Sequence, residues 1–395
     1  MAILVPIEVI EPKRVEVRDL LSVMADILRK WGVDEPVVMK GDEVVKGERI
    51  VEALRRLGAR YIPVKRSGEQ DYFTPLDALG FYDELSPSRL RVFNNTLELL
   101  YRNWPTPLVR LNSLSIGEVR VWAKLEAYNP FSNSVKDRIG WYMVKKFIEE
   151  KGRVEKVYEA TSTNTGMAIA ALGAIMGFSS RLYLPASIQK ASDILLKALG
   201  AEVVRKRKAL TVEFLDEVLE DARRDGAVSL NQFENDANFE VHLRYTAKEL
   251  DLQMQSAGIR AEAIIGGIGT SGHLSAITFY FKNKLRGTMR IYAVQPAPGE
   301  TIPGIRRVET GMKWIHWIRP DRVIEVTRDE AIEGVLRVAR RDGILVGLSS
   351  GAVAAAFQKL LELGEIGEGD YVVIFPDNGL KYVEQLQAYF EKRGI

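Results

Sequence analysis

Hydrophobic positions after residue 105 recur in short blocks that predict an alternation of strands and helices. Apolar runs bounded by polar or glycine-rich segments predict strands at 119–125, 157–160, 181–185, 202–204, 263–265, 290–294 and 371–375. Helical spacing follows several of them, for example at 212–224 and at 327–339, where Thr327 and Glu330 have the spacing of a capping box. Strands that alternate with helices favour parallel sheets covered by helices on both faces, so the sequence predicts the α/β class.

The first 75 residues have the pattern of a separate, smaller α/β unit. Their spacing predicts strands at 5–10, 36–39 and 61–64, a helix at 17–31, and a turn and helix at 45–58 that ends at Gly58. The next segment mixes prolines with polar and helical stretches. We therefore predict an N-terminal domain at 1–75, a connector at 76–104 that packs on the following domain, and a main domain at 105–395.

The composition is that of an ordinary soluble globular protein. The 395 residues are 46% hydrophobic and 27% charged, with a formal net charge of +2. This balance gives no electrostatic reason to expect binding to nucleic acid or to an anionic membrane. No apolar run is long enough to span a bilayer, and the first residues do not have the pattern of a signal peptide, so we expect a cytoplasmic protein without membrane contact.

The counts of cysteine and histidine narrow the possible chemistry further. Cysteine is absent, which excludes disulfides, thiolate catalysis and cysteine-based metal sites. Only His242, His273 and His316 are present, and we expect no metal site. The lack of cysteine together with many arginines and glutamates is typical of proteins from hot environments, so we expect a thermophilic source.

Four polar or glycine-rich loops carry the candidate chemistry, each directly after a strand or at the start of a helix. They lie at 128–138, 161–166, 266–272 and 347–352. Ligands in open α/β sheets bind at the carboxyl ends of strands, where such loops lie. The hydroxyl-rich loop 161–166 at a helix N-terminus is suited to a carboxylate, and the glycine loop 266–272 is suited to a phosphate. The glycine spacing differs from that of a dinucleotide fingerprint.

Lys136 stands at a junction between loop and helix. Apolar residues at 139, 143 and 147 share one stripe of a helix that begins near Asp137. A lysine desolvated near the positive end of a helix dipole is deprotonated more easily, as a nucleophilic amine must be. Pyridoxal phosphate requires an amine to hold its aldehyde and a separate anion site for its phosphate. The combination therefore predicts pyridoxal 5'-phosphate as the cofactor.

Residues 105–395 resemble the cysteine synthase/cystathionine β-synthase family of fold type II pyridoxal-phosphate enzymes. The matching motifs occur in the family's order at 106–108, 129–130, 134–138, 161–166, 232–235, 266–272, 349–351 and 376–377. The resemblance implies two α/β sheet domains of the parallel type and a transferase that acts by lyase-like β-elimination. It also implies a homodimer.

The same resemblance implies a role for each matching residue. Lys136 would bind the cofactor covalently and carry the proton. The other implied cofactor contacts are Asn164 to the phenolic oxygen, Gly267, Gly269, Thr270 and Ser271 to the phosphate, and Ser349 to the pyridine nitrogen. The substrate carboxylate would be held by Thr161, Ser162, Thr165 and Gln232.

Two further segments, 231–238 and 302–311, are similar to the O-phosphoserine sulfhydrylases of archaea, a branch of this family. The similarity implies that an arginine meets the substrate phosphate, and we assign this role to Arg306, with Arg307 as second choice. A guanidinium fork suits a phosphate dianion and disfavours a neutral acetyl ester. The implied reaction is replacement of phosphate in O-phospho-L-serine by sulfide to give L-cysteine, in cysteine biosynthesis; use of O-acetylserine stays open.

Other readings also stay open. Cystathionine β-synthase, threonine synthase and serine or threonine deaminase use the same cofactor, and threonine synthase also has a phosphorylated substrate. Residues 1–75 resemble the ParB/sulfiredoxin-like domain, whose Gly-Glu-Arg-Arg box handles nucleotide phosphates. Gly47, Glu48 and Arg49 match this box, whereas Ile50 replaces its second arginine. The domain is then either a packing unit or a nucleotide site, and the whole chain is alternatively a nucleotide-sensing regulator with an inactive pyridoxal domain.

Overall fold

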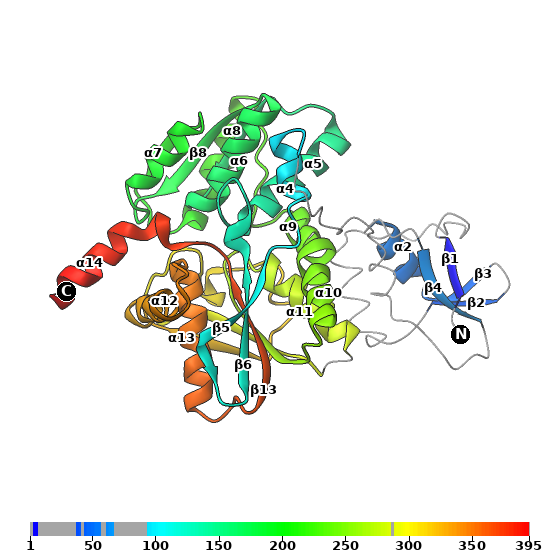
Figure 1. Cartoon of the computed structure of the whole chain (residues 1–395). Coiled ribbons are helices and arrows are strands. Elements are labelled where there is room, and N and C mark those ends of the chain that lie inside the picture. Colours follow the sequence, from blue (N-terminus) through cyan, green and yellow to red (C-terminus); the bar gives the residue numbers. More distant parts are fainter. Residues whose placement is uncertain are drawn as a thin grey trace.

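The computed structural model describes residues 3–6, 37–40, 43–56, 61–66, 93–285 and 288–394 (Figure 1). The described strands form a four-stranded N-terminal sheet, a six-stranded sheet and a three-stranded sheet. Among these residues no helix is long and apolar enough to cross a membrane.

The N-terminal sheet has the order β1-β4-β2-β3. Its strands are β1 (Ile3–Pro6), β2 (Val37–Lys40), β3 (Glu43–Lys46) and β4 (Tyr61–Arg66), and helix α2 (Glu48–Arg56) follows β3. The strands predicted at 36–39 and 61–64 are confirmed. The strand predicted at 5–10 overlaps β1 at 5–6, and its other residues lie outside the described ones. Strand β3 includes residues predicted as a turn. Three of the four residues of β3 are exposed, so this edge strand lacks a hydrophobic signal. The helix predicted at 17–31 lies outside the described residues.

The six-stranded sheet has the order β12-β11-β10-β13-β6-β5. Its strands are β5 (Leu108–Ile116), β6 (Val119–Leu125), β10 (Ala261–Gly267), β11 (Arg290–Pro296), β12 (Arg322–Val326) and β13 (Gly369–Phe375). All neighbouring pairs are parallel except β5 and β6. The four inner strands were predicted, whereas the edge strands β5 and β12 were not, because both are partly exposed and have short or interrupted apolar patterns.

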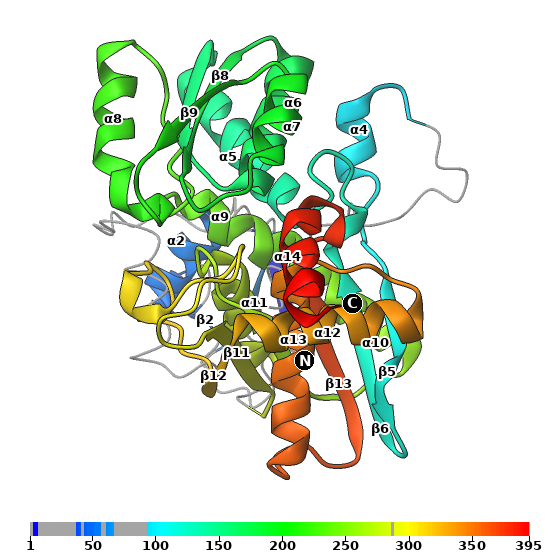
Figure 2. The ribbon, with the colours of Figure 1, turned by 90° about the vertical axis from the view of Figure 1, so that its left-hand side faces the viewer.

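The three-stranded sheet is parallel and consists of β7 (Lys156–Ala160), β8 (Ser179–Pro185) and β9 (Glu202–Lys206). Helices α5 (Lys136–Lys151), α6 (Thr163–Met176), α7 (Ala191–Ala198) and α8 (Leu215–Arg224) accompany it. Figure 2 shows this layer above the six-stranded sheet, with the last helix, α14 (Val383–Arg393), in front. The segment predicted as one helix at 212–224 is divided into a 3-10 turn (Thr211–Phe214) and α8.

Helices cover both faces of the six-stranded sheet. The remaining helices are α4 (Thr96–Tyr101), α9 (Asp236–Val241), α10 (Lys248–Ala257), α11 (Gly272–Lys284), α12 (Arg328–Asp342) and α13 (Leu348–Glu362), with a π-helical turn (His242–Ala247) between α9 and α10. Along β13, Val372 and Ile374 pack in the cluster that contains α11, whereas Val373 and Phe375 pack in the cluster that contains α12 and α13. A central strand that is buried on both faces is apolar over most of its length, which explains why its hydrophobic run at 371–375 predicted a strand.

The carboxyl ends of four strands face one region between the six-stranded and the three-stranded sheet. The loop after β6 leads to Lys136, the loop after β7 opens α6, the loop after β10 opens α11, and Pro376 follows β13. The N–H of Val135 donates to the carbonyl of Pro376 at 2.8 Å, and Asn164 contacts Asp377 at 2.8 Å. These bonds join the lysine loop and the start of α6 to the segment that follows β13.

Candidate active site

Lys136 is the first residue of α5, as the sequence predicted within one residue. The loop before it is folded around Asp137, whose carboxylate accepts the backbone N–H groups of Phe131 at 2.7 Å and Ser132 at 2.9 Å and also the Ser132 hydroxyl. The ammonium of Lys381 closes the loop by donating to the Ser132 carbonyl at 2.6 Å. Burial raises the pKa of Asp137 to about 6 against the effect of these donors.

The environment of Lys136 lowers the pKa of its amine and so favours the neutral form. Burial lowers the pKa of Lys136 to about 8, and the charges of Asp377 and Glu126 act in the opposite direction. A buried amine with a pKa near 8 is neutral in an appreciable fraction at neutral pH, as an attacking or proton-accepting amine requires. The predicted reactivity of this lysine thus has a physical basis in the structure.

The glycine loop lies against Lys136 in one small cavity. The cavity is lined by Val135, Lys136, Gly267, Gly269, Thr270, Ser271, His273, Leu274, Gly304, Ile305 and Pro376. A Cβ at Gly267 would lie 2.6 Å from Ile305, and a Cβ at Gly269 would lie 2.6 Å from the Gly304 carbonyl, so neither position accommodates a side chain. Ser271 has a φ of +73° and directly precedes α11, whose N-terminus favours an anion.

Asn238 and His273 contact or adjoin the glycine loop, and neither had a predicted role. Asn238 donates to the Thr270 hydroxyl at 2.8 Å and to the Gln232 carbonyl at 2.7 Å, so it fixes the loop that carries Thr270. His273 lies in the first turn of α11, and burial lowers its pKa to about 3, which keeps the ring neutral. Its ring packs edge-to-face on His242, with centroids 4.9 Å apart. His273 belongs to no motif in the sequence, so its position beside the cavity could not be predicted.

Asn164 is fixed by a residue far away in the sequence. Its amide nitrogen donates to the Asp377 carboxylate at 2.8 Å, while its carbonyl oxygen is buried without a hydrogen-bond partner. Asn164 lines a second small cavity with Ser162, Thr163, Gly304 and Tyr382, among others. Gly304 also lines the Lys136 cavity, so the two cavities adjoin at this glycine.

Ser349 lies at the start of α13 and is 2% exposed. A Cβ at Gly304 would lie 3.4 Å from its hydroxyl oxygen, which places Ser349 beside the residue that the two cavities share. The structure therefore brings Lys136, the glycine loop, Asn164 and Ser349 to one region, although these residues come from four separate loops.

The residues predicted to bind a carboxylate surround the start of α6. The Thr165 hydroxyl donates to the Gln232 side-chain carbonyl at 2.7 Å, and the Gln232 amide donates to the Ala160 carbonyl at 3.0 Å. Ser162 is the N-cap residue of α6, but its side chain makes no capping bond there. The Thr161 hydroxyl donates to the Ser162 carbonyl at 2.6 Å. The predicted set is thus assembled at a helix N-terminus.

Arg306 and Arg307 differ sharply in environment. Arg307 pairs with Glu325 at 2.7 Å and with Glu309 at 2.9 Å. No carboxylate of the described residues pairs with Arg306: its Nε donates to the Gly269 carbonyl at 2.9 Å, and its Nη1 is buried without a hydrogen-bond partner. Burial lowers the pKa of Arg306 to about 10, so the guanidinium still carries its charge at neutral pH. Of the two predicted candidates, Arg306 is the one that retains an unused donor beside the glycine loop.

A buried network of charges holds the helix that begins with Lys136. Arg138 donates to Glu126 at 2.6 Å and to Glu249 at 2.6 Å, and Lys124 donates to Glu249 at 2.5 Å. All four side chains are fully buried. The guanidinium of Arg138 also lies 4.4 Å from the ring centre of Trp104. The network links β6, α5 and α10 and so fixes the direction of α5.

Replacing Glu249 with alanine is expected to lower the free energy of unfolding by about 3–5 kcal/mol, because it leaves buried cations without their counter-charge. Urea denaturation at neutral pH measures this loss. The matched control is Glu202→Ala, which breaks an ion pair to Arg181 whose carboxylate is 57% exposed and is expected to cost less than about 1 kcal/mol. A loss at Glu249 no larger than that of the control would contradict this role.

The same network predicts how stability depends on pH. Burial alone would raise the pKa of Glu126, but the Arg138 charge and its hydrogen bonds hold that pKa well below the ordinary value of 4.5. A carboxyl whose pKa is lowered in the folded state stabilises the fold above its unfolded pKa. This contribution is therefore complete at neutral pH and is lost as the pH falls below about 4.5.

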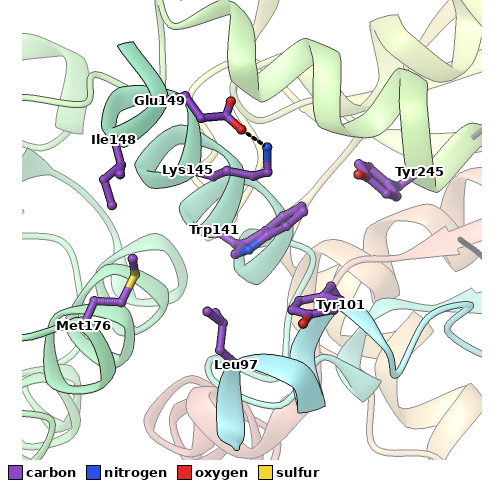
Figure 3. Close-up of a pocket in the computed structure, with 8 residues that line it drawn as sticks. All are labelled: Leu97, Tyr101, Trp141, Lys145, Ile148, Glu149, Met176 and Tyr245. Atoms are coloured by element: carbon purple, nitrogen blue, oxygen red, sulfur yellow. Dashed lines mark hydrogen bonds and ion pairs between the residues drawn. The ribbon is translucent and has the colours of Figure 1, made fainter. Parts of the chain in front are cut away.

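Another pocket lies apart from these loops, between α4, α5 and α6 (Figure 3). Its lining is apolar and aromatic, with Trp141 between Tyr101 and Tyr245 and with the Lys145–Glu149 ion pair at one side. None of the predicted site residues lines it. Among the described residues, no group of three or more metal-ligating side chains is placed to hold a metal ion.

The residues present fit pyridoxal phosphate. Its phosphate requires an anion site at a helix N-terminus, and the glycine loop that leads into α11 lines the cavity. Its aldehyde requires a desolvated amine, and Lys136 lies in the same cavity. The unpartnered polar atom of Asn164 shows that hydrogen-bonding capacity is unused at this site.

Comparisons with known proteins agree with this chemistry. Residues 99–377 match the family model described as "Pyridoxal-phosphate dependent enzyme". Cysteine synthase A of Escherichia coli K12 is 36% identical over 301 residues, and the cysteine synthase of Buchnera aphidicola subsp. Schizaphis graminum is 34% identical over 302 residues; each alignment covers 70% of this chain and 91% of the relative.

Solved structures show the same fold. The O-ureido-L-serine synthase matches with a TM-score of 0.64 and 25% identity, over 74% of this chain and 94% of that chain. A hydrogen sulfide-producing enzyme of Fusobacterium nucleatum matches with a TM-score of 0.66 and 27% identity, over 74% and 100%. The fold is therefore that of fold type II pyridoxal-phosphate enzymes, and the chain belongs to the pyridoxal-phosphate-dependent enzyme family.

Proposed function

We propose that this protein is a cysteine synthase that replaces the phosphate of O-phospho-L-serine with sulfide. The observation that carries the choice of substrate is Arg306, a buried guanidinium that lies beside the glycine loop and has no ion-pair partner in the part of the chain that the structure describes. A phosphate dianion would satisfy its unused donor and its charge, whereas an acetyl ester would not. The cysteine synthases among its relatives support the reaction type.

Residues of this chain carry out proton transfer and bind the substrate carboxylate. When bound, pyridoxal phosphate supplies an electron sink that acidifies the substrate α-carbon. Lys136 takes the α-proton and later returns it, which its pKa of about 8 permits. The carboxylate of the substrate is held at the α6 N-terminus by Thr161, Ser162, Thr165 and Gln232.

The departing phosphate is stabilised by a different residue, Arg306. The Cβ–O bond of the substrate breaks and phosphate departs with the bonding electrons, so negative charge on its oxygens is stabilised by Arg306. Sulfide then forms the Cβ–S bond, and Lys136 protonates the α-carbon. Phe233, whose ring centre lies 4.9 Å from the Arg306 guanidinium, keeps that cation oriented and partly shielded from water.

For the N-terminal sheet we propose a packing role. Ile50, which stands where the second arginine of the resembled nucleotide-binding box is expected, is 1% exposed and belongs to a core cluster with Val37 and Val51. An apolar side chain buried at this position contributes to packing and offers no contact to a phosphate. The ParB/sulfiredoxin-like resemblance would then concern the fold of this segment and not nucleotide binding.

The proposal is tested by comparing two substrates with the purified wild-type protein. We expect kcat/KM for cysteine formation from O-phosphoserine and sulfide to exceed that from O-acetylserine by about tenfold or more, since a charge-assisted hydrogen bond is worth about 1.5–3 kcal/mol. Cysteine is measured directly, with phosphate or acetate release as a second product. Equal or better use of O-acetylserine would contradict the assignment of the substrate.

A further inference from the structure

Asp377 joins the loops of the active site through its backbone. It follows β13 in the Pro376–Asp377 motif, for which the sequence supplied no role. Its carbonyl accepts the N–H of Gly347 at 3.0 Å and the Ser350 hydroxyl at 3.4 Å, and the preceding Pro376 carbonyl accepts the N–H of Val135 at 2.8 Å. The lysine loop and the Ser349 loop therefore both meet at this dipeptide.

The Asp377 side chain is buried in the same place, at 1% exposure. One carboxylate oxygen, Oδ2, accepts the Tyr382 hydroxyl at 2.5 Å and the Asn164 amide at 2.8 Å. The ammonium of Lys381 lies 3.8 Å from the same oxygen. A Cβ at Gly347 would overlap the other oxygen, Oδ1, so the loop before α13 is shaped to admit this carboxylate.

A carboxylate fixes the orientation of an amide that it contacts. An ionised carboxylate can only accept hydrogen bonds, so Asn164 must present its NH₂ group and not its oxygen to Asp377. An NH₂ group has two hydrogens, so in this orientation Asn164 presents a donor to Asp377 and Tyr382 and at the edge of the neighbouring cavity. Without a nearby acceptor the amide could rotate by half a turn and would then offer an acceptor where a donor is needed.

We propose that Asp377 and Tyr382 are positioning residues of the active site: the Asp377 carboxylate holds the Asn164 amide with its donor toward the cofactor, and the Tyr382 hydroxyl holds that carboxylate in place. The inference rests on the proposed contact between Asn164 and the phenolic oxygen of the cofactor. It does not depend on which serine derivative is the substrate.

Asp377 also acts on Lys136 through its charge. Its negative charge is the larger of two that raise the pKa of Lys136 against burial, and Glu126 supplies the other. The further ionisable groups around this pair are Lys381 and Tyr382 beside Asp377, Asp137 near Lys381, and His242 and His273, whose pKa values the charges of Lys136 and Arg138 lower. Both histidines are neutral because of burial, so removal of the Asp377 charge should lower the pKa of Lys136.

Asp377→Asn tests the proposal in the full-length chain freed of cofactor. The rate at which this chain captures added pyridoxal phosphate, followed by absorbance against pH, reports when the Lys136 amine is neutral. We expect the wild-type midpoint near pH 8 and a shift of about one unit to lower pH in the variant. We also expect the dissociation constant of the cofactor to rise about tenfold, because Asn164 loses its fixed orientation. A variant with wild-type midpoint and affinity would overturn the proposal.

Tyr382→Phe separates the two effects and decides the question if Asp377→Asn does not fold. It keeps the Asp377 charge but removes the bond that holds the carboxylate. The expected result is an unchanged pH midpoint with a dissociation constant raised about fivefold to tenfold. The matched control is Tyr389→Phe, which removes another tyrosine–carboxylate bond, to Glu333 at 3.2 Å, on α14. Wild-type cofactor affinity in Tyr382→Phe, or an equal loss in Tyr389→Phe, would refute the positioning role.

Discussion

Replacement of Lys136 with alanine is expected to abolish cysteine formation and the covalent attachment of the cofactor together. The amine is the one that lies in the cavity with the glycine loop, and burial has lowered its pKa to about 8. Within the described ranges no other lysine lines that cavity. Loss of both the attaching amine and the proton carrier should reduce kcat by a factor of about 10³ or more.

The measurement combines turnover with mass spectrometry after borohydride reduction. In the wild-type protein the reduced cofactor should be found on the peptide that contains Lys136, and in the variant it should be absent. The matched control is Lys145→Ala on the same helix, whose side chain is 41% exposed and pairs with Glu149. Turnover in the Lys136 variant near the level of the control, or cofactor attached to another lysine, would refute the assignment.

Arg306→Ala is expected to impair use of O-phosphoserine far more than use of O-acetylserine. The variant removes a buried cation whose Nη1 has no partner among the described residues, so it should mainly weaken binding of a phosphate. We expect kcat/KM for O-phosphoserine to fall by about 10- to 150-fold, which corresponds to a charge-assisted bond of about 1.5–3 kcal/mol. O-acetylserine, which carries no phosphate, should change by less than about threefold.

The adjacent Arg307 supplies a matched control. It has the same side chain but its guanidinium is occupied by Glu309 and Glu325 near the surface. Arg307→Ala should therefore leave both substrates nearly unchanged and cost at most about 1 kcal/mol of stability. Equal losses for both substrates in Arg306→Ala, or a larger selective loss in Arg307→Ala, would remove Arg306 from the proposed role.

The parts of the fold that were predictable from sequence are those where local pattern and burial agree. The inner strands β10, β11 and β13 are buried on both faces and so appear as uninterrupted apolar runs. The edge strand β12 alternates between buried and exposed positions over only five residues, which is too short to stand out. The π-helical turn at 242–247 depends on packing against α11 and has no local signature.

The candidate site likewise has features that local sequence predicts and features that it does not. The lysine loop and the glycine loop could be recognised because each combines a special residue with the start of a helix. The contact of Asn164 with Asp377 joins residues 213 positions apart, and the difference between Arg306 and its neighbour depends on which of them reaches Glu325. Such long-range geometry is fixed by packing and not by spacing along the chain. Sequence analysis could therefore propose both arginines as phosphate ligands, and it predicted no role for Asp377.

The most direct test of the central claim is the visible absorption spectrum of the purified protein as O-phosphoserine is added without sulfide. The account predicts a protein with a pyridoxal-phosphate absorption band that changes on addition of O-phosphoserine, with release of about one phosphate per site. It also predicts that sulfide restores the original band and yields cysteine. An absorption band that does not change when O-phosphoserine is added, with no phosphate released, would contradict the proposed function.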